Sequence, residues 1–350
     1  MDLPALEDAS LQLFVFGPGV GELVVVRAPP GRWLVVDGCS VGGRHYGQQL
    51  LDHYGVTPDF VILTHPHLDH AKGVAEVIDA ATTDPDPKTW PRIGLVWPRD
   101  ETTPSDLSHL THYYDSGVAE QAVSAIFDRW ERVPSCRLKL DQGDVLPFGE
   151  ARLKVLSPAP ATRTEAVRRW TAKQDFDSNR LSTVLQVEWA GLRILLGSDL
   201  VEIPGAGWTD VLAFDAEAPR HAAFKVAHHG STKAQHPAVL TRMGPDDEPT
   251  WVATPYATKR LPGFQPGEGG AVLLGHVPKI HLTGVPRAFQ NQGVTPSSYR
   301  LSDLQGPAQG LKRDPPVTGF PDCLVALSWK AGGGPPTVHH GKGSLTVERG

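Results

Sequence analysis

Apolar runs of four to six residues, separated by turn residues, recur through the first 63 positions and indicate buried β-strands. Residues 11–16 and 23–27 are separated by a glycine-rich turn, and a Pro-Pro-Gly sequence precedes the run at 33–36. Asp37 and Gly38 follow that third run and predict a turn there. Residues 60–63 form a further apolar run, and the residues with the strongest chemical signal follow it directly.

Apolar residues at helical spacing lie between and after these strands. Val74, Val77 and Ile78, for example, predict a helix over 73–81. The same reasoning extends to the rest of the chain. Further helices are expected at 46–54, 118–132, 164–173 and 239–243, and further strands at 136–140, 144–147, 152–156, 181–189, 193–196, 222–227, 251–253, 279–282, 323–329 and 344–347.

Two segments lack this regular pattern. Residues 82–116 are largely polar and proline-rich apart from an apolar stretch at 93–97. We interpret 82–116 as an insertion that forms a lid or a substrate wall, and as the place where a protein partner would bind. Residues 286–320 are rich in loop-forming residues and predict a C-terminal extension that starts near 286. We expect a single domain over 1–350, with no internal repeat.

Composition is that of an ordinary globular protein, with 40% hydrophobic and 21% charged residues. The net charge of −6 argues against a protein that coats nucleic acid, although bound metal ions would add positive charge that this count omits. Cys39, Cys136 and Cys323 are far apart and odd in number, so we expect no disulfide framework and a cytoplasmic protein. We also expect no signal peptide and no membrane-spanning segment.

The segment from Thr64 to His70 contains four residues of metal-binding type within six positions. In an extended loop, His65 and His67 project to the same side and Asp69 continues that alternation, whereas His70 projects differently. One loop can therefore serve two neighbouring ions, with His65 and His67 on the first and Asp69 and His70 on the second. Histidines that merely fill a core would not account for so dense a cluster.

Two later strand ends carry further ligand-type residues. Asp199 follows the apolar run at 193–196 and is placed to bridge two ions, although an aspartate after a strand also commonly forms a turn. His228 and His229 end the strand predicted at 222–227, and the sequence leaves open which of them is a ligand.

Several polar residues near these motifs are candidates for substrate contact, each with a structural alternative. Ser231 is placed to contact substrate or to act as a helix N-cap. Lys225 is a second candidate, but a solvated lysine at the edge of the strand is the commoner outcome. A basic helix face before Asn179 would steer a phosphate backbone or simply face solvent; its members are Arg163, Arg168, Arg169 and Lys173.

The order of these motifs resembles the metallo-β-lactamase fold superfamily, and within it the hydrolase domain of the competence protein ComEC and its soluble relatives. The likeness rests on the loop from His65 to His70, on Asp199 after Gly-Ser, and on the sequence Lys-Val-Ala-His-His-Gly-Ser at 225–231. This last piece is the most specific to the branch. The resemblance spans residues 11–260, and its other matching parts are 17–22, 34–38 and 179–185.

The resemblance implies an α/β fold, the four-layer αββα metallo-β-lactamase sandwich. It implies two divalent metal ions, with zinc expected and manganese or iron as alternatives, and hydrolysis of phosphodiester, ester, thioester or amide bonds. ComEC-like members are associated with nuclease or phosphodiesterase activity. We therefore expect a phosphodiesterase or nuclease that acts on nucleic acid or a nucleotide. A hydroxide held by both metals would attack, with Asp69 orienting it and Asp199 bridging the ions.

One departure from the superfamily pattern concerns the first metal. Many members supply a third histidine to it, but this chain has no histidine between His112 and Asp199. Asn179 and Ser182 occupy the corresponding region, as candidates for the metal surroundings or for substrate contact. We expect water to complete the site; His109 or His112 folding in from the insertion is the alternative. The gap keeps two other functions open: an esterase, lactonase or thioesterase of the same fold, and a binding or regulatory module that lacks turnover.

Overall fold

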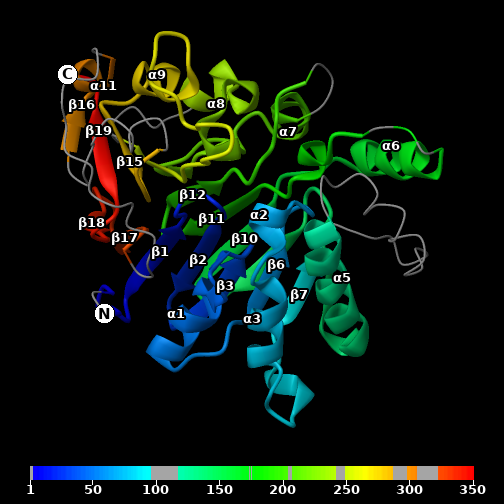
Figure 1. The fold of residues 1–350 in the computed structure, drawn as a ribbon. Helices are drawn as coiled ribbons and strands as arrows, with labels where there is room; N and C mark the ends of the chain where they lie inside the picture. Colours follow the sequence, from blue (N-terminus) through cyan, green and yellow to red (C-terminus); the bar gives the residue numbers. More distant parts are fainter. Residues whose placement is uncertain are drawn as a thin grey trace.

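Two β-sheets lie face to face, with helices on the outer face of each, in the computed structural model (Figure 1). The structure describes residues 3–95, 117–172, 174, 176–203, 207–241, 249–286, 298–305 and 322–350. This is the four-layer αββα sandwich that the sequence predicted.

The first sheet has eight strands in the order β18-β17-β1-β2-β3-β6-β7-β8. Strands β3, β6, β7 and β8 are parallel to one another. The other neighbouring pairs in this sheet are antiparallel. The strands are β1 (Ser10–Phe16), β2 (Leu23–Ala28), β3 (Arg32–Val36), β6 (Phe60–Leu63), β7 (Arg92–Leu95), β8 (Arg137–Lys139), β17 (Leu324–Lys330) and β18 (Thr337–His340).

The second sheet has nine strands in the order β16-β19-β15-β14-β13-β12-β11-β10-β9, and β12 to β15 are parallel. A separate two-stranded ribbon is made by β4 (Ser40–Val41) and β5 (Arg44–His45). The strands of the second sheet are β9 (Val145–Phe148), β10 (Ala151–Val155), β11 (Leu185–Trp189), β12 (Leu192–Leu196), β13 (Ala223–Lys225), β14 (Thr250–Ala253), β15 (Lys279–Leu282), β16 (Ser298–Arg300) and β19 (Leu345–Glu348).

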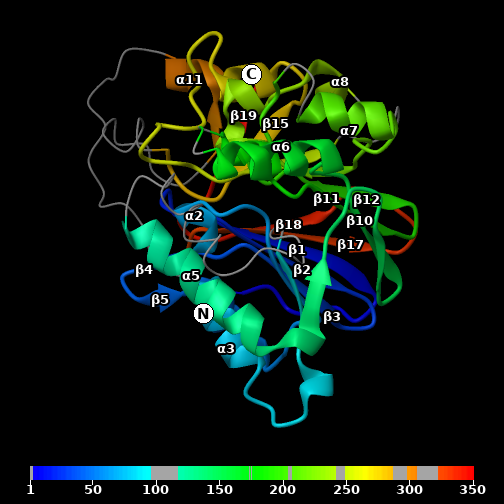
Figure 2. The same cartoon turned by 90° about the vertical axis from the view of Figure 1, so that its right-hand side faces the viewer.

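The helices form the outer layers, which the side view separates clearly (Figure 2). Helices α1 (Tyr46–Tyr54), α3 (Val74–Ala81) and α5 (Gly117–Arg132) cover the first sheet, and α7 (Trp208–Phe214), α8 (Pro237–Thr241) and α9 (Gly269–Leu274) cover the second. The remaining helices are α2 (Leu68–Ala71), α6 (Pro160–Thr171), α11 (Leu301–Gln305), and the 3-10 turns η1 (Pro87–Thr89), η2 (Pro134–Cys136), η3 (Ser178–Leu181), η4 (Ala227–Gly230) and η5 (Thr232–Ala234).

Alternate side chains of β1 join apolar clusters on opposite faces of the first sheet. Leu11, Leu13 and Val15 join the apolar cluster between the two sheets. Phe14 and Phe16 point the other way, into the cluster beneath α1 and α3. Successive side chains of a strand face opposite sides of the sheet, so a strand that is apolar throughout needs cover on both. A third cluster lies between the second sheet and its helices.

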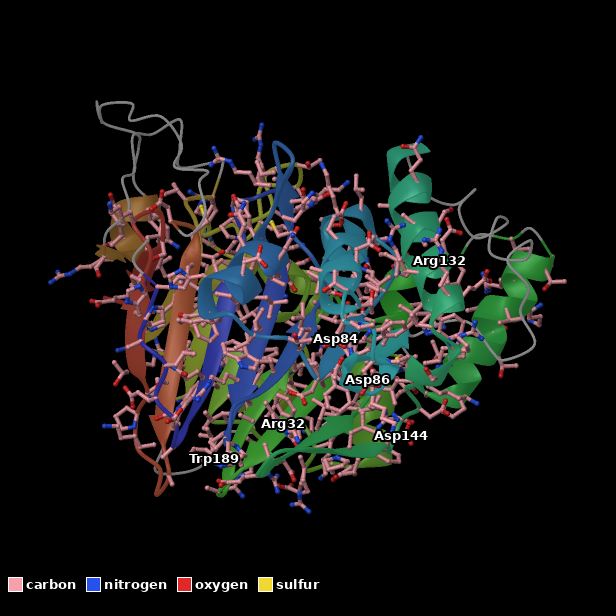
Figure 3. All side chains as sticks on the ribbon, turned by 90° about the horizontal axis from the view of Figure 1, so that it is seen from below. Arg32, Asp84, Asp86, Arg132, Asp144 and Trp189 are labelled. Atoms are coloured by element: carbon pink, nitrogen blue, oxygen red, sulfur yellow. The ribbon has the colours of Figure 1, made fainter. Side chains whose placement is uncertain are left out.

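The parallel strands place all the predicted ligand segments at one end of the sandwich. Strands β6, β12 and β13 each run directly into such a segment, since the carboxyl ends of parallel strands meet at one edge of a sheet. At the opposite end Arg32 begins β3 and Trp189 ends β11, as the labels in Figure 3 show. There the two sheets are joined by a hydrogen bond from the Glu150 amide to the Pro29 carbonyl, at 2.8 Å.

The predicted insertion at 82–116 is only partly described. Strand β7 (Arg92–Leu95) accounts for the apolar stretch expected at 93–97 and pairs with β6 and β8, so this part belongs to the first sheet. Residues 96–116, including His109 and His112, lie outside the described residues. The helix expected at 164–173 starts earlier, at Pro160, and ends at Thr171. Among the described helices, none is long and apolar enough to cross a membrane.

Candidate metal centre

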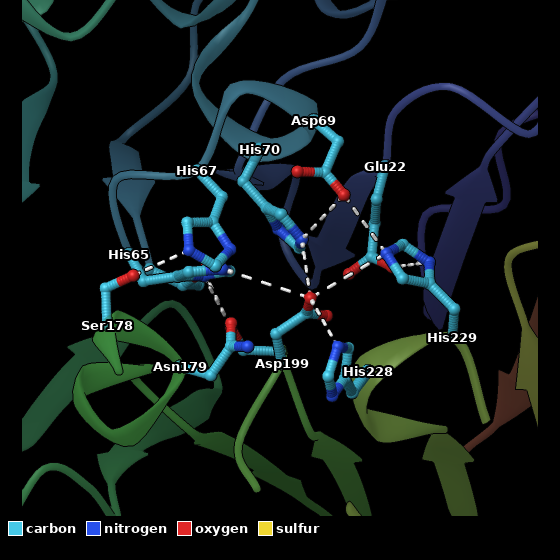
Figure 4. Close-up of polar contacts among 12 residues, drawn as sticks. Glu22, His65, His67, Asp69, His70, Ser178, Asn179, Asp199, His228 and His229 are labelled. Carbon is cyan, nitrogen blue, oxygen red and sulfur yellow. Dashed lines mark hydrogen bonds and ion pairs between the residues drawn. The ribbon is translucent and has the colours of Figure 1, made fainter. Parts of the chain in front are cut away.

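The loop after β6 enters the short helix α2, and it brings four ligand-type side chains to the carboxyl end of the first sheet. Asp199 and the pair His228 and His229 arrive from the facing sheet, after β12 and β13. Figure 4 shows these side chains converging from the two sheets on one point. The structure thus brings together residues that are up to 164 positions apart in the sequence, from His65 to His229.

One carboxylate oxygen, Asp199 Oδ2, is at the middle of this cluster. Four imidazole Nε2 atoms surround it: those of His70 at 3.4 Å, His229 at 3.7 Å, His65 at 3.9 Å and His228 at 4.0 Å. These distances are longer than ordinary hydrogen bonds. Ligand atoms ~2.1 Å from a single ion lie roughly 3.4 Å apart at tetrahedral angles, so the spacing resembles that of ligands around ions.

The ligand-type atoms fall into two groups that share Asp199. Within each group the atoms lie within 4.8 Å of one another: His65, His67 and Asp199 in the first, and Glu22, His70, Asp199 and His229 in the second. Asp69 lies beside the second group, with its Oδ2 3.2 Å from His229 Nε2 and 3.8 Å from His70 Nε2. Buried Nε2 atoms of His65 and His70 and the Oδ1 atom of Asp199 have no hydrogen-bond partner in the described structure. These polar atoms suit coordination by cations.

His228 and His229 differ in position. The His229 side chain is 1% exposed and its nitrogen joins the second group, whereas His228 is 21% exposed and joins neither group. Its assignment as a ligand therefore stays a prediction. In Figure 4 His228 lies beside Asp199, with its Nε2 atom 4.0 Å from Asp199 Oδ2.

Hydrogen bonds from outside the cluster orient the imidazoles. His70 Nδ1 lies 2.7 Å from Asp37 Oδ2, and Asp37 also accepts hydrogen bonds from the Thr64 amide and hydroxyl. Thr64 Oγ1 is in turn 3.1 Å from His65 Nδ1. Such partners fix the tautomer and direction of a ligating histidine. Ser178 Oγ lies 2.6 Å from Nε2 of His67 and orients that ring in the same way.

Backbone strain is concentrated at this centre. Six non-glycine residues in the described part of the chain have a positive φ, and four of them are Asp37, Ser198, His228 and His229. Each such residue costs about 1–3 kcal/mol and persists only where the surroundings hold it. The consecutive left-handed residues His228 and His229 turn the chain so that both imidazoles face Asp199.

Burial and the neighbouring charges shift the pKa values of the cluster's histidines in opposite directions. Burial lowers the pKa of His65, and His70 and His67 lower it further, so that imidazole is held neutral as a ligand must be. Burial also lowers the pKa of His70, but Asp199 and Asp37 outweigh it and raise that pKa well above its usual value. Burial raises the pKa of Asp69, but His70 and His229 outweigh it and lower that pKa to about 2. Divalent ions would supply the positive charge that these protons now provide.

The remaining predicted residues have mixed placements. Asn179 and Ser182 are buried, and their side-chain oxygens have no hydrogen-bond partner in the described structure. Ser231 accepts a hydrogen bond from the Lys233 amide at 3.4 Å, so its N-cap alternative is confirmed. Lys225 is fully buried and pairs with Glu22, so the expectation of a solvated lysine is wrong. Its ammonium group instead contacts Glu22 and the Ser198 carbonyl oxygen inside the protein.

The arginines on the basic face of α6 form ion pairs with nearby carboxylates. Arg168 and Arg169 both pair with Glu165, and Arg163 pairs with Asp141. Lys173 lies outside the described residues. The sequence reasoning also missed four residues that hold the ligands in place, because each comes from a different segment: Glu22, Asp37, Ser178 and Thr254.

Residues 17–85 match the sequence model of the metallo-β-lactamase superfamily, a range that includes the loop from His65 to His70. A hydroxyacylglutathione hydrolase of Xanthomonas euvesicatoria pv. vesicatoria (strain 85-10) is 34% identical over 85 residues. That match covers 24% of this chain and 29% of the relative, so this chain spans less than a third of its length.

Solved structures with related folds share little sequence with this chain. A metallo-β-lactamase from Staphylococcus aureus subsp. aureus COL has 13% identity and a TM-score of 0.35, over 62% of this chain and 53% of that one. A diphosphatase of the PhnP family has 10% identity and a TM-score of 0.32, over 62% and 74% of the two chains. Similarities of this size say nothing about substrate.

Proposed function

We propose that this chain, which has the fold and the ligand loop of the metallo-β-lactamase superfamily, is a phosphodiesterase or nuclease with a dinuclear metal centre. The observation that carries the metal-dependent part is the convergence of four imidazoles on Asp199 Oδ2, with Asp69 beside them. Nitrogen and carboxylate donors of this kind suit zinc, with manganese or iron as alternatives.

The residues fit two ions that share Asp199. His65 and His67 would hold the first, and Asp69, His70 and His229 the second. When bound, two such ions supply Lewis acidity, lower the pKa of a coordinated water and neutralise charge on a phosphoryl oxygen. The protein itself keeps the donors in place through Asp37, Thr64 and Ser178.

The chain's own nucleophilic side chains have other roles in the described structure. Ser198 Oγ donates to Thr64 Oγ1 at 2.7 Å, and Ser231 caps η5. Ser198 Oγ also lies 3.5 Å from His65 Nδ1, but its hydrogen is directed to Thr64, so His65 does not act as its base. This supports direct attack by water rather than a covalent protein intermediate.

Phosphodiester chemistry is supported by the resemblance of residues 225–231 to the ComEC-like branch. A thioesterase is the second candidate, because the Xanthomonas relative is named as a hydroxyacylglutathione hydrolase. The absence of a histidine from 113–198 favours the first candidate, since a thioesterase of that type would be expected to have its third metal histidine there.

The test begins with the metal content of the purified protein. Activity is then measured on bis-p-nitrophenyl phosphate, on single- and double-stranded DNA and RNA, and on an acylglutathione thioester. Asp69→Ala should abolish hydrolysis, whereas Asp52→Ala, which removes an exposed carboxylate on α1, should leave it unchanged. A protein without bound metal, or an active Asp69→Ala variant, would overturn the metal mechanism. Turnover of the thioester alone would overturn the phosphodiester assignment.

A further inference from the structure

A buried chain of polar groups leads from Lys225 to the second metal group, and the mechanism above does not use it. Lys225 Nζ donates to Glu22 Oε1, with both side chains only 1% exposed. Thr254 Oγ1 donates to Glu22 Oε2 at 2.5 Å. His229 Nδ1 then lies 2.9 Å from Thr254 Oγ1 and 3.2 Å from the Thr254 carbonyl oxygen.

The direction of these hydrogen bonds follows from the donors available. A carbonyl oxygen only accepts hydrogen bonds. The Thr254 hydroxyl already uses its one hydrogen in the bond that it donates to the Glu22 carboxylate, so towards His229 it can only accept. Both Thr254 oxygens near His229 Nδ1 are therefore acceptors, as is Glu22 Oε2 at 3.6 Å, and Nδ1 must carry the proton. In the neutral imidazole the Nε2 atom is then left with its lone pair, facing Asp69 Oδ2 at 3.2 Å and Asp199 Oδ2 at 3.7 Å.

We infer that Glu22, held by Lys225, acts through Thr254 to fix the Nδ1–H tautomer of His229, and that Glu22 is a positioning residue and not a metal ligand. This inference rests on the proposed metal centre and concerns its second site. Glu22 lies within reach of the second group, but its Oε1 is taken by Lys225 and its Oε2 by Thr254. The positive charge of Lys225 balances Glu22, which keeps a further anion away from the ions.

The surroundings hold this chain rigidly. Glu22 follows the glycine-rich turn after β1, Lys225 ends β13, and Thr254 follows β14, the parallel neighbour of β13. The Tyr256 ring stacks on the His229 ring with centroids 4.9 Å apart and 14° between the planes. His70 has the shorter version of the same device, since Asp37 contacts its Nδ1 directly. The Nδ1 atom of each histidine in the second group is thus held by a carboxylate. Asp37 contacts His70 directly, and Glu22 acts on His229 through Thr254.

The test compares Thr254→Val with Thr254→Ser, using Co²⁺ as the probe. Valine keeps the shape of threonine and removes the hydroxyl, whereas serine keeps the hydroxyl. The affinities of the first and second Co²⁺ equivalents are measured by competition with a chelator, and the exchangeable imidazole N–H signals are recorded by NMR of the Co²⁺-loaded protein.

Thr254→Val should bind one of the two Co²⁺ ions ~10–100-fold more weakly and should speed the exchange of one N–H signal, as expected for loss of a ligand's outer partner. Thr254→Ser should bind both Co²⁺ ions within about 3-fold of the original affinity, a much smaller change than the loss expected for Thr254→Val. Wild-type affinities and signals in Thr254→Val would overturn the inference.

A second variant guards against misfolding of Thr254→Val. Glu22→Gln combined with Lys225→Met removes both charges together, and it should weaken the same Co²⁺ ion. Unchanged binding in this double variant would also overturn the inference. Protein that binds two ions and shows these effects but cleaves no phosphodiester would instead overturn the proposed substrate class.

Discussion

His70 Nδ1 contacts Asp37 Oδ2 at 2.7 Å, although the two residues are 33 positions apart. Each follows one of two neighbouring parallel strands, β3 and β6, so the register Val36 with Ile62 brings them together. Asp37 has φ 61°, which aspartate and asparagine tolerate better than most residues.

Asp37→Asn should therefore fold and yet bind metal poorly. Asparagine accepts through one oxygen only and cannot receive the His70, Thr64 amide and Thr64 hydroxyl hydrogen bonds as the carboxylate does. We expect a ~10–100-fold loss of affinity for the second metal. Zinc affinity by competition titration checks this, with circular dichroism as the control for folding. Undiminished zinc affinity would show that Asp37 only shapes the loop.

Alanine variants of His228 and His229 should differ in the number of metal ions that they bind. His229→Ala should lose one of two metal ions, because its nitrogen belongs to the second group. His228→Ala should keep both ions and lose about 10–100-fold in kcat/KM, since its partly exposed side chain lies beside Asp199, where it would position substrate. Elemental analysis and a phosphodiester assay distinguish the two. Loss of a metal from His228→Ala would instead make His228 the missing ligand of the first ion.

Lys225→Met should destabilise the fold strongly. It leaves the Glu22 carboxylate buried without its cation, and breaking a buried pair in this way costs about 3–5 kcal/mol. The double variant with Glu22→Gln should recover part of that loss because no unpaired charge remains. Urea unfolding of the metal-free protein measures both free energies of unfolding. A single variant as stable as the double one would mean that the pair is not coupled.

His221 should contribute to acid lability. It is buried, its Nδ1 lies 2.7 Å from the Pro219 carbonyl oxygen, and its Nε2 accepts from Trp251 Nε1 at 3.0 Å. Burial lowers its pKa to about 4, against an ordinary value of 6.5 in the unfolded chain. The unfolded state therefore takes up a proton first, and stability present above pH 6.5 is lost as the pH falls towards 4.

The size of this effect is about 3 kcal/mol for a shift of that order. Unfolding of the metal-free protein should thus depend less on pH between 6.5 and 4 in His221→Gln than in the original chain. Comparing the two proteins cancels the titration of the other histidines. Identical pH dependence would show that His221 is not held neutral.

The sequence by itself determined the local parts of this protein. The period of two along β1 and the apolar run before Thr64 identified strands, because side-chain alternation is a local property of the chain. Four ligand-type residues in one loop likewise predicted a metal centre, because their spacing alone brings them together. Asp199 and the histidine pair were found by the same rule, that polar residues after buried strands gather at one edge of a sheet.

Only the tertiary structure decided which distant residues act on those ligands. Glu22 and Thr254 are 232 positions apart, and Glu22 and Lys225 are 203 apart. Their contact depends on how the two sheets face each other, which no local pattern encodes. Lys225 has the sequence context of an exposed lysine, but its side chain is buried and pairs with Glu22, which directly precedes β2 of the other sheet. The difference between His228 and His229 arises in the same way, since two adjacent left-handed residues direct neighbouring side chains to different sides of one carboxylate.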